Sequence, residues 1–356
     1  MSFSLSSSLS PALSPALSPA LCAPPGSPVF DLASPCLPWE QQAACVLELA
    51  RTRAVAPEDL LRHAGLARSA LISPRQLLAL LAALQHRLPA TDTPFVLGQL
   101  SLPGHAGLAS HALLQAATLG EALELLCRYA GRLSPLLTPR LLLHGDEALL
   151  LWTESCGIPA AQRAFVVDMH MSALKSLCQW QGGAALPWRF CFNRTRPRDL
   201  SQHVVFLGAE LSFGCQFDAM RLPAALLSRR WPRAVKPNLA QRALEQNADP
   251  AAAGRGLLAA LYDWLLPRYR EATPLEQAAQ AFGVSPATLK RRLALHGTHY
   301  QAQLDQARSH VALYLLLLQG RSSDSIASEL GFHDRSSFRR SFKRWTGLTP
   351  GVALSG

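Results

Sequence analysis

The sequence predicts an α+β protein in which a mixed N-terminal domain is joined to an all-α C-terminal domain. Residues 76–88 place leucine at intervals of three and four, which is the period of a helix face. Residues 140–144 and 148–153 instead resemble two strands that flank a Gly145-Asp146-Glu147 turn. Beyond residue 255 the helical period alone recurs. We therefore expect a sheet packed with helices in the N-terminal domain and helices alone in the C-terminal domain.

The first 38 residues are expected to form a disordered head. Ser-Pro-Ala-Leu occurs three times in succession between residues 10 and 21, and more prolines follow. Proline at every fourth residue prevents a helix from propagating and provides no N–H for a strand ladder. A signal peptide would need a basic start, but the first basic residue is Arg51. We therefore expect a cytoplasmic protein.

The remaining chain is expected to divide into three parts. Residues 39–231 would form one mixed domain, residues 232–254 a partly helical linker, and residues 255–356 a helical domain. Further elements expected in the mixed domain are helices over 118–132 and 160–180 and strands over 188–193 and 203–207.

Composition and charge narrow the function classes. Hydrophobic residues make up 49% of the 356 residues, but no apolar run exceeds eight, so no membrane span is expected. The net charge is +10, and residues 272–356 hold 10 of the 34 basic residues but only 5 of the 24 acidic ones. Half of the positive excess thus lies in the last quarter, which suggests a polyanionic partner. The eight cysteines form no C-x-x-C pair and no histidine pair has metal-ligand spacing, so we expect reduced thiols and neither metal nor cofactor.

Two segments of the C-terminal domain share one pattern. Each has an alanine, Ala279 or Ala327, four residues before a glycine that is followed by a helix-capping residue. Apolar residues then follow at +4 and +8 from the cap, with arginine at +6. Glycine adopts the positive φ that ends a helix sharply, and a small alanine lets a second helix cross closely. The pattern predicts two helix-turn-helix units with turn and cap residues Gly283 and Ser285 in the first and Gly331 and Asp334 in the second.

The second helix of each unit is predicted to bury an apolar face and to expose a basic one. Leu289 and Leu293 would be buried in the first unit, and Phe338 and Phe342 in the second. An exposed basic helix that follows a tight turn fits the major groove of double-stranded DNA. An apolar stripe over residues 304–318 predicts one long helix between the units, which would separate them by about one DNA turn of roughly 34 Å.

These residues resemble a known family. Residues 331–350, with Ser337-Phe338-Arg339-Arg340-Ser341-Phe342-Lys343-Arg344-Trp345 at their centre, resemble the signature of the AraC/XylS family of bacterial transcription regulators. Residues 288–293 and 303–308 are similar to the first unit and connecting helix of that family. The resemblance covers about 100 residues and departs at Val352-Ala353-Leu354, where the family usually has Tyr-Arg.

The front domain resembles, more loosely, the effector domain of the ornithine- and arginine-responsive branch. The similar residues are Gly107-Leu108, residues 118–123, Tyr129, Phe192 and Phe213. The resemblance implies a homodimer that responds to a small-molecule effector and activates transcription through RNA polymerase. The resemblance does not identify the effector or the residues of its pocket. It does not identify the operator sequence either.

The resemblance also implies which residues would contact DNA. Arginine pairs with a guanine edge through two hydrogen bonds, whereas alanine offers apolar contact to a thymine methyl. His333 and Thr298 are weaker candidates for backbone contact. The residues expected to face bases are Ala287, Lys290 and Arg291 in the first unit and Arg335, Ser336, Arg339 and Arg340 in the second. The residues expected to meet phosphates are Arg321, Lys343 and Arg344.

Two other function classes are alternatives to a ligand-responsive regulator. An enzyme fused to a DNA-binding module would need a nucleophile beside its base, but no cysteine has an adjacent histidine and Asp168 and His170 are two apart on a helix. The second alternative is a DNA-binding protein whose front domain is a non-sensing dimerisation scaffold. Aromatic residues that could line an apolar effector pocket, or simply form core, are Trp152, Trp180, Trp188 and Phe190.

Overall fold

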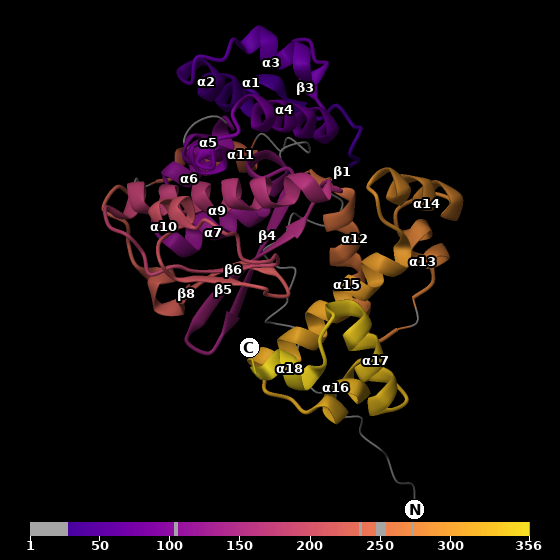
Figure 1. The fold of residues 1–356 in the computed structure, drawn as a ribbon. Coiled ribbons are helices and arrows are strands. Elements are labelled where there is room, and N and C mark those ends of the chain that lie inside the picture. The colour runs from indigo at the N-terminus through magenta and orange to yellow at the C-terminus, as the bar shows by residue number, and fades with distance from the viewer. Residues whose placement is uncertain (1–27, 103–105, 235–236, 247–253, 272, 356) are drawn as a thin grey trace, which may run out of the picture.

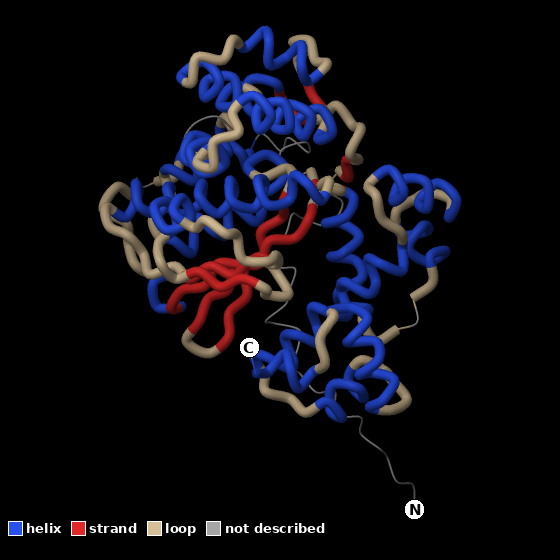
Figure 2. Tube along the Cα trace, viewed as in Figure 1, coloured by secondary structure: helices blue, strands red, loops and turns tan. Residues whose placement is uncertain are grey.

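The computed structural model describes residues 28–102, 106–234, 237–246, 254–271 and 273–355. Strands gather in the N-terminal part and the C-terminal part is helical, as Figure 2 shows, so the predicted α+β class is confirmed. The expected disordered head lies outside the described residues as far as residue 27. Among the described residues, no helix combines the length and apolarity that a membrane crossing requires.

The N-terminal domain is a sheet with helices stacked above one of its faces (Figure 1). Its longest helix begins after Pro159 and ends at Gly183, whose φ of 68° is left-handed, which confirms the predicted helix over 160–180. The helices are α1 Trp39–Gln42, α2 Ala44–Thr52, α3 Pro57–Ala64, α4 Pro74–Arg87, α5 Thr93–Ser101, α6 Leu108–Leu114, α7 Leu119–Arg128, α8 Ala130–Leu133, α9 Ala160–Gly182, α10 Ser201–Leu207 and α11 Leu239–Gln246, with a 3₁₀ turn over Ala224–Ser228.

The main sheet has the strand order β4-β5-β8-β6-β7. Its β6 and β7 are parallel and its other neighbours are antiparallel. The predicted hairpin is confirmed, because Leu143 pairs with Ala148 around a turn in which Gly145 has a φ of 54°. The strands are β4 Leu137–His144, β5 Glu147–Glu154, β6 Arg189–Phe192, β7 Leu211–Phe213 and β8 Asp218–Pro223, with short β1 Val29–Phe30, β2 Leu37–Pro38, β3 Leu71–Ile72 and β9 Arg255–Gly256 outside this sheet.

Alternate residues of the sheet enter two separate apolar clusters. Leu150 and Trp152 of β5 belong to the main N-terminal core, together with residues of the covering helices. Leu149 of β5 and Cys191 of β6 belong to a small cluster on the opposite face, against which Leu318 of the C-terminal domain packs. The period-2 alternation of a strand therefore gives this sheet one face for its own domain and one for its neighbour.

Two expected elements of the N-terminal domain are corrected. Residues 203–207 form helix α10 rather than a strand, because His203 and Leu207 are buried four residues apart while Val205 between them is exposed. The helix expected over 118–132 ends at Arg128, since Tyr129 leaves helical geometry with a φ of −106°, and the short α8 follows.

The expected head and linker also carry ordered structure. Within residues 28–38, β1 pairs in parallel with β9 and β2 pairs with β3. This part of the head is therefore ordered, contrary to the expectation of disorder. In the expected linker, 232–254, α11 confirms the partial helicity. The side chain of Asn238 donates to the carbonyl of Ala112, and Ala240 joins the N-terminal core, which attaches α11 to α6.

The C-terminal domain is built around α15. The stripe predicted over residues 304–318 lies on one continuous helical segment, whose last turn is a π-helix over Tyr314–Leu318, and it is buried except for the partly buried Leu318. Its elements are α12 Leu257–Leu265, a 3₁₀ turn Leu266–Arg268, α13 Leu275–Ala281, α14 Pro286–Leu295, α15 Tyr300–Leu313, α16 Ser323–Glu329, α17 Arg335–Thr346 and α18 Pro350–Ser355.

Candidate nucleic-acid interface and effector cavity

The first helix-turn-helix unit consists of α13 and α14. Gly283 has a φ of 65°, and the Ser285 hydroxyl accepts a hydrogen bond from the Thr288 N–H at 3.1 Å. Pro286 follows at the first helical position, where its missing N–H costs nothing. Leu289 and Leu293 are completely buried, as predicted, so α14 turns its other side to solvent.

The second unit, α16 and α17, repeats this construction. Gly331 has a φ of 72° and passes close to the carbonyl oxygen of Arg270. A side chain there would both strain the left-handed backbone and crowd this oxygen. The Asp334 carboxylate accepts a hydrogen bond from the Ser337 N–H at 2.7 Å, and the Ser337 backbone and hydroxyl bonds lower the pKa of Asp334. Phe338 and Phe342 are completely buried. Both predicted turn-and-cap pairs are therefore present.

The predicted base-facing side chains lie on two exposed helix faces. Arg340 donates to the Ser337 hydroxyl at 3.1 Å, and Arg335 lies 3.4 Å from Asp324 in an exposed pair. Within the described parts of the chain, no acidic side chain forms an ion pair with Lys290 or Arg291. Figure 1 shows α14 and α17 on either side of α15. The exposed residues are Ala287, Lys290 and Arg291 on α14 and Arg335, Ser336, Arg339 and Arg340 on α17.

The side chains predicted to contact phosphates differ in exposure and in whether a carboxylate already pairs with them. Lys343 is exposed at the last turns of α17. Arg344 is exposed as well but pairs with Asp305 at 3.2 Å. Arg321 is partly buried and lies 3.4 Å from Glu329, whose pKa is lowered, against the cost of burial, by Tyr269 and Arg270. Lys343 is thus the member of this group best placed to meet a phosphate.

Sequence reasoning missed a contact between the first unit and the N-terminal domain. The Arg292 Nε donates to both carboxylate oxygens of Asp31, at 2.9 and 3.0 Å. The ring nitrogens of His296 lie 3.3 Å from the Leu32 nitrogen and 3.1 Å from the Gly157 nitrogen. A Cβ at Gly157 would overlap the carbonyl oxygen of His296, so glycine is required for this approach. Asp31 and Arg292 are 261 positions apart in the chain, so the sequence holds no local signal of the pair.

A buried ionic cluster forms a second contact between the domains. Arg140 of β4 pairs with Asp263 of α12, which also pairs with Arg255 at 3.0 Å. The Arg140 guanidinium lies 4.3 Å from the centre of the Tyr262 ring, and the Tyr262 hydroxyl is 2.9 Å from the His310 Nδ1. Removing one member would leave a buried charge uncompensated, which typically costs about 3–5 kcal/mol. This cluster therefore holds the sheet against the helices of the C-terminal domain.

A cavity of about 430 Å³ lies between the sheet and the C-terminal helices. The sheet contributes its outward face, and α15 with its π-helical turn and α18 contribute the opposite wall. Arg221 and Glu147 provide charge at one side, and the Arg221 Nε is buried without a hydrogen-bond partner among the described residues. The apolar lining includes Leu142, Leu149, Leu151, Leu313, Leu317 and Val352.

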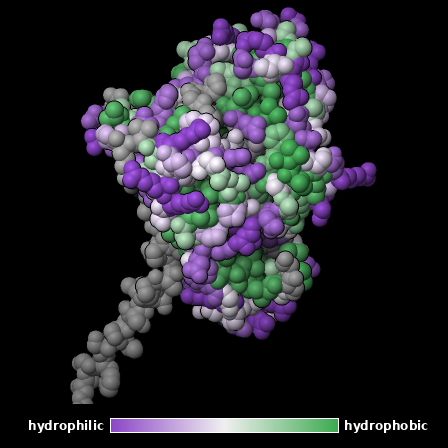
Figure 3. Space-filling model, turned by 90° about the vertical axis from the view of Figure 1, so that its left-hand side faces the viewer, coloured by the Kyte–Doolittle hydropathy of each residue, from purple (hydrophilic) through white to green (hydrophobic). Residues whose placement is uncertain are grey.

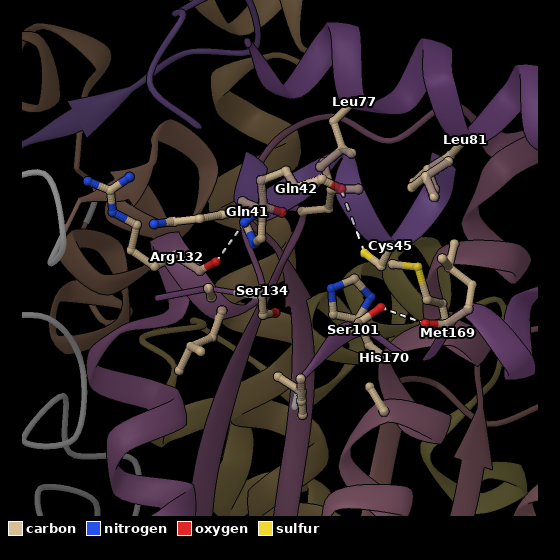
Figure 4. A pocket seen from close by; sticks show the side chains of 18 of the residues that line it. Gln41, Gln42, Cys45, Leu77, Leu81, Ser101, Arg132, Ser134, Met169 and His170 are labelled. Atoms are coloured by element: carbon tan, nitrogen blue, oxygen red, sulfur yellow. Dashed lines mark hydrogen bonds between the residues drawn. The ribbon is translucent and has the colours of Figure 1, made fainter. Parts of the chain in front are cut away.

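A smaller cavity of about 50 Å³ lies inside the N-terminal domain (Figure 4). Figure 4 shows Gln41, Cys45 and His170 around it. Burial lowers the pKa of His170 to about 4 although its Nδ1 lies 2.7 Å from the Val166 carbonyl oxygen. This volume suits one or two waters rather than an organic effector.

The four aromatic residues considered as a pocket do not line one cavity. Trp152 borders the small cavity, whereas Trp188 and Phe190 are buried in the core. Trp180 is 48% exposed and has the Arg233 guanidinium 4.6 Å from its ring centre. Core packing, the other interpretation, accounts for three of the four.

Asp168 and His170 also have separate partners. Asp168 pairs with Arg194 at 2.5 Å and lies 3.5 Å from His203, whereas His170 contacts a backbone carbonyl. The two side chains therefore do not form an acid–base pair, in line with their spacing on α9.

Comparisons with known proteins agree with this architecture. Residues 55–231 match the arabinose-binding N-terminal domain of AraC transcription regulators, and residues 278–355 match a helix-turn-helix domain. The ornithine utilization regulator of Pseudomonas aeruginosa is 31% identical over 261 residues, covering 72% of this chain and 76% of that protein. This chain belongs to the AraC family of transcription regulators.

Two further proteins are similar to this chain over most of its length. An uncharacterized HTH-type transcriptional regulator of Mycobacterium tuberculosis is 25% identical over 259 residues, covering 69% of this chain and 73% of that protein. The crystal structure of the transcriptional regulator CdpR from Pseudomonas aeruginosa aligns with a TM-score of 0.46 at 20% identity, over 90% of this chain and 99% of that one. As an AraC-type protein, this chain is a DNA-binding transcription regulator with an effector-type N-terminal domain.

Proposed function

We propose that this AraC-family protein reads a promoter by placing α14 and α17 in successive major-groove segments of one DNA face. The observation that supports this most directly is the pair of capped helices with exposed basic faces on either side of α15. The predicted residues of α14 and α17 would read the bases, and Lys343 would contact the phosphate backbone. Arg344 and Arg321 would contact it once their ion pairs with Asp305 and Glu329 break.

We expect the Lys343→Ala variant to bind every DNA sequence more weakly. A lysine that neutralises one phosphate releases about one counterion, so the slope of log affinity against log salt should flatten by about one unit. Fluorescence anisotropy titrations on a preferred and a scrambled duplex at several salt concentrations measure this. Arg196→Ala, which removes an exposed charge from the N-terminal domain, should leave the slope unchanged. A change of base preference in Lys343→Ala would contradict its assignment to phosphate.

The effector is proposed to bind in the cavity between the domains. Its volume of about 430 Å³ falls in the range of small-molecule sites, whereas the cavity inside the N-terminal domain is nearly tenfold smaller. The lining favours a largely apolar molecule with one polar end beside Arg221 and Glu147. Because both domains line the cavity, a bound molecule favours whichever domain arrangement it fits better, which is the requirement for a switch.

A cavity-filling pair of variants tests this location. Leu149 is buried in the cavity wall, whereas Leu143 of the adjacent strand is 52% exposed. A compound that raises the melting temperature of the full chain in a screen of small apolar acids and alcohols should fail to do so for Leu149→Trp and should still act on Leu143→Trp. A shift that persists in Leu149→Trp would move the effector elsewhere. If no compound acts on the full chain, the scaffold alternative is favoured.

The remaining assignments of the proposed function rest on family resemblance. We infer that the protein acts in the cytoplasm as a homodimer and activates transcription through contact with RNA polymerase. One face of the molecule shows several separate green apolar patches among polar side chains (Figure 3). The exposed apolar residues of the N-terminal domain include Trp180, Val204 and Val205, on or beside α9 and α10. We propose that two copies meet through this part of the N-terminal domain.

A further inference from the structure

Two cysteines meet at the side of the sheet that faces the DNA-binding domain. Cys191 is on β6, and Cys215 follows the parallel neighbour β7, where its N–H donates to the Phe192 carbonyl at 3.0 Å. Both line the cavity between the domains and belong to one small apolar cluster, beside which the Cys215 thiol donates to the Ser212 carbonyl at 3.6 Å. Strand pairing places Cys191 opposite Ser212, only three residues before Cys215. The sheet itself therefore brings the two cysteines close together.

The two thiols differ in environment. Cys191 is buried, and the neighbouring Cys215 thiol and burial both raise its pKa. Cys215 is half-buried, and the neighbouring Cys191 thiol lowers its pKa to about 7 against the opposing effect of burial, with Arg221 also lowering it. Burial instead raises the pKa of the half-buried Cys36 to about 11. Cys215 thus carries thiolate near neutral pH and Cys191 acts as its proton-bearing neighbour.

Cys215 is also reachable from solvent. It lines a second, polar cleft of about 660 Å³ between the β6–β7 end of the sheet and the DNA-binding domain. The cleft includes Arg194 on the sheet side and His299, Asp305 and Arg344 on the other. A small water-soluble oxidant can therefore approach Cys215 without passing through the apolar core.

We propose that Cys191 and Cys215 form a peroxide-sensitive dithiol that closes reversibly into an intramolecular disulfide. The Cys215 thiolate attacks a hydroperoxide, the O–O bond breaks, and the released oxygen leaves as water or alcohol after taking a proton, which makes Cys215 a sulfenic acid. The Cys191 sulfur then loses its proton and attacks Cys215, the S–O bond breaks, and a second water leaves. Two thiols are oxidised by two electrons and one peroxide is reduced, so the step is balanced.

The disulfide would lie where the domains meet. Cys191 and Cys215 share an apolar cluster with Phe217 and with Leu318 of the π-helical turn that leads to α16. Drawing the two sulfurs to bonding distance, about 2 Å, changes the wall on which Leu318 packs. The oxidation state of this pair would therefore bias how the second helix-turn-helix unit is held against the sheet.

Peroxide treatment of the full chain tests the dithiol directly. The test uses a Cys22→Ser variant, because the seven cysteines that remain in it all lie among the described residues. We expect hydrogen peroxide to consume two thiols, to link the peptides that contain Cys191 and Cys215, and to be reversed by dithiothreitol. With Cys191→Ser, a single sulfenic acid should form at Cys215 and be trapped by dimedone. With Cys215→Ser, the same dose should leave Cys191 reduced.

Alkylation rates give a second readout that does not depend on oxidation. At pH 7 a larger fraction of Cys215 than of Cys36 is thiolate, but the less basic Cys215 thiolate is also the weaker nucleophile. The two effects together predict that Cys215 reacts with iodoacetamide at least roughly 50-fold faster than Cys36. The Cys36→Ser variant, which removes the matched half-buried cysteine, should oxidise as the parent does. Equal labelling of Cys215 and Cys36, or a disulfide between any other pair, would overturn the proposal.

Discussion

Arg291→Ala and Arg340→Ala should each lower affinity for the preferred DNA site by about 5- to 150-fold and remove discrimination at one base position. Each arginine can form two hydrogen bonds with a guanine edge, and such a pair contributes about 1–3 kcal/mol of discrimination. Both side chains are exposed at equivalent positions, six residues after the capping residue of their unit. Because the two sites are in separate units, their losses should add in the double variant.

Arg292 provides the matched control for Arg291. It is the next residue on α14, has the same chemistry, and is engaged by Asp31 of the N-terminal domain instead of facing outward. Selection from a random duplex library, followed by sequencing, measures base preference for every variant. We expect Arg292→Ala to retain the parental preference. If Arg291→Ala and Arg340→Ala also retained it, α14 and α17 would not be the recognition helices.

Leu293→Ala should destabilise the first helix-turn-helix unit by about 2–5 kcal/mol, whereas Leu295→Ala should change its stability by less than about 0.5 kcal/mol. Both substitutions remove the same atoms from the same helix, but Leu293 is completely buried and Leu295 is 49% exposed. Truncating a buried leucine loses its transfer free energy and leaves a cavity. An exposed leucine has little of either to lose.

Hydrogen exchange of the full chain reports this difference locally. A two-domain protein does not unfold in one step, so a single melting curve would blur the effect. Protection of the backbone amides of α13 and α14 should fall in Leu293→Ala and stay at the parental level in Leu295→Ala. Site-specific DNA affinity should fall with it, because α14 has to be folded to be inserted. Equal protection in the two variants would show that α14 is not packed as described.

Local features were predictable wherever residues a few positions apart decide the conformation. The caps at Ser285 and Asp334, the left-handed glycines and the buried pairs of α14 and α17 all appear as predicted. Each depends on a hydrogen bond or a helical period that spans three or four residues. The segment 203–207 was mistaken for a strand because five residues can fit either period, and its contact with the core decided the outcome.

Contacts between distant segments carried no such signal. The pairing of Val29 with Arg255, the Asp31–Arg292 ion pair and the glycine at position 157 each join parts of the chain more than 100 residues apart. The cavity between the domains and the Cys191–Cys215 pair arise from the same long-range packing.

Residue pattern alone was enough to establish the α+β class, the two DNA-binding units and their capping residues, since short-range hydrogen bonds and amphipathic periods are written along the chain. The seating of those units against the sheet, and the space left for a ligand, depended on the folded arrangement. Complementary shape and charge between surfaces distant in sequence have no period that a single chain can display.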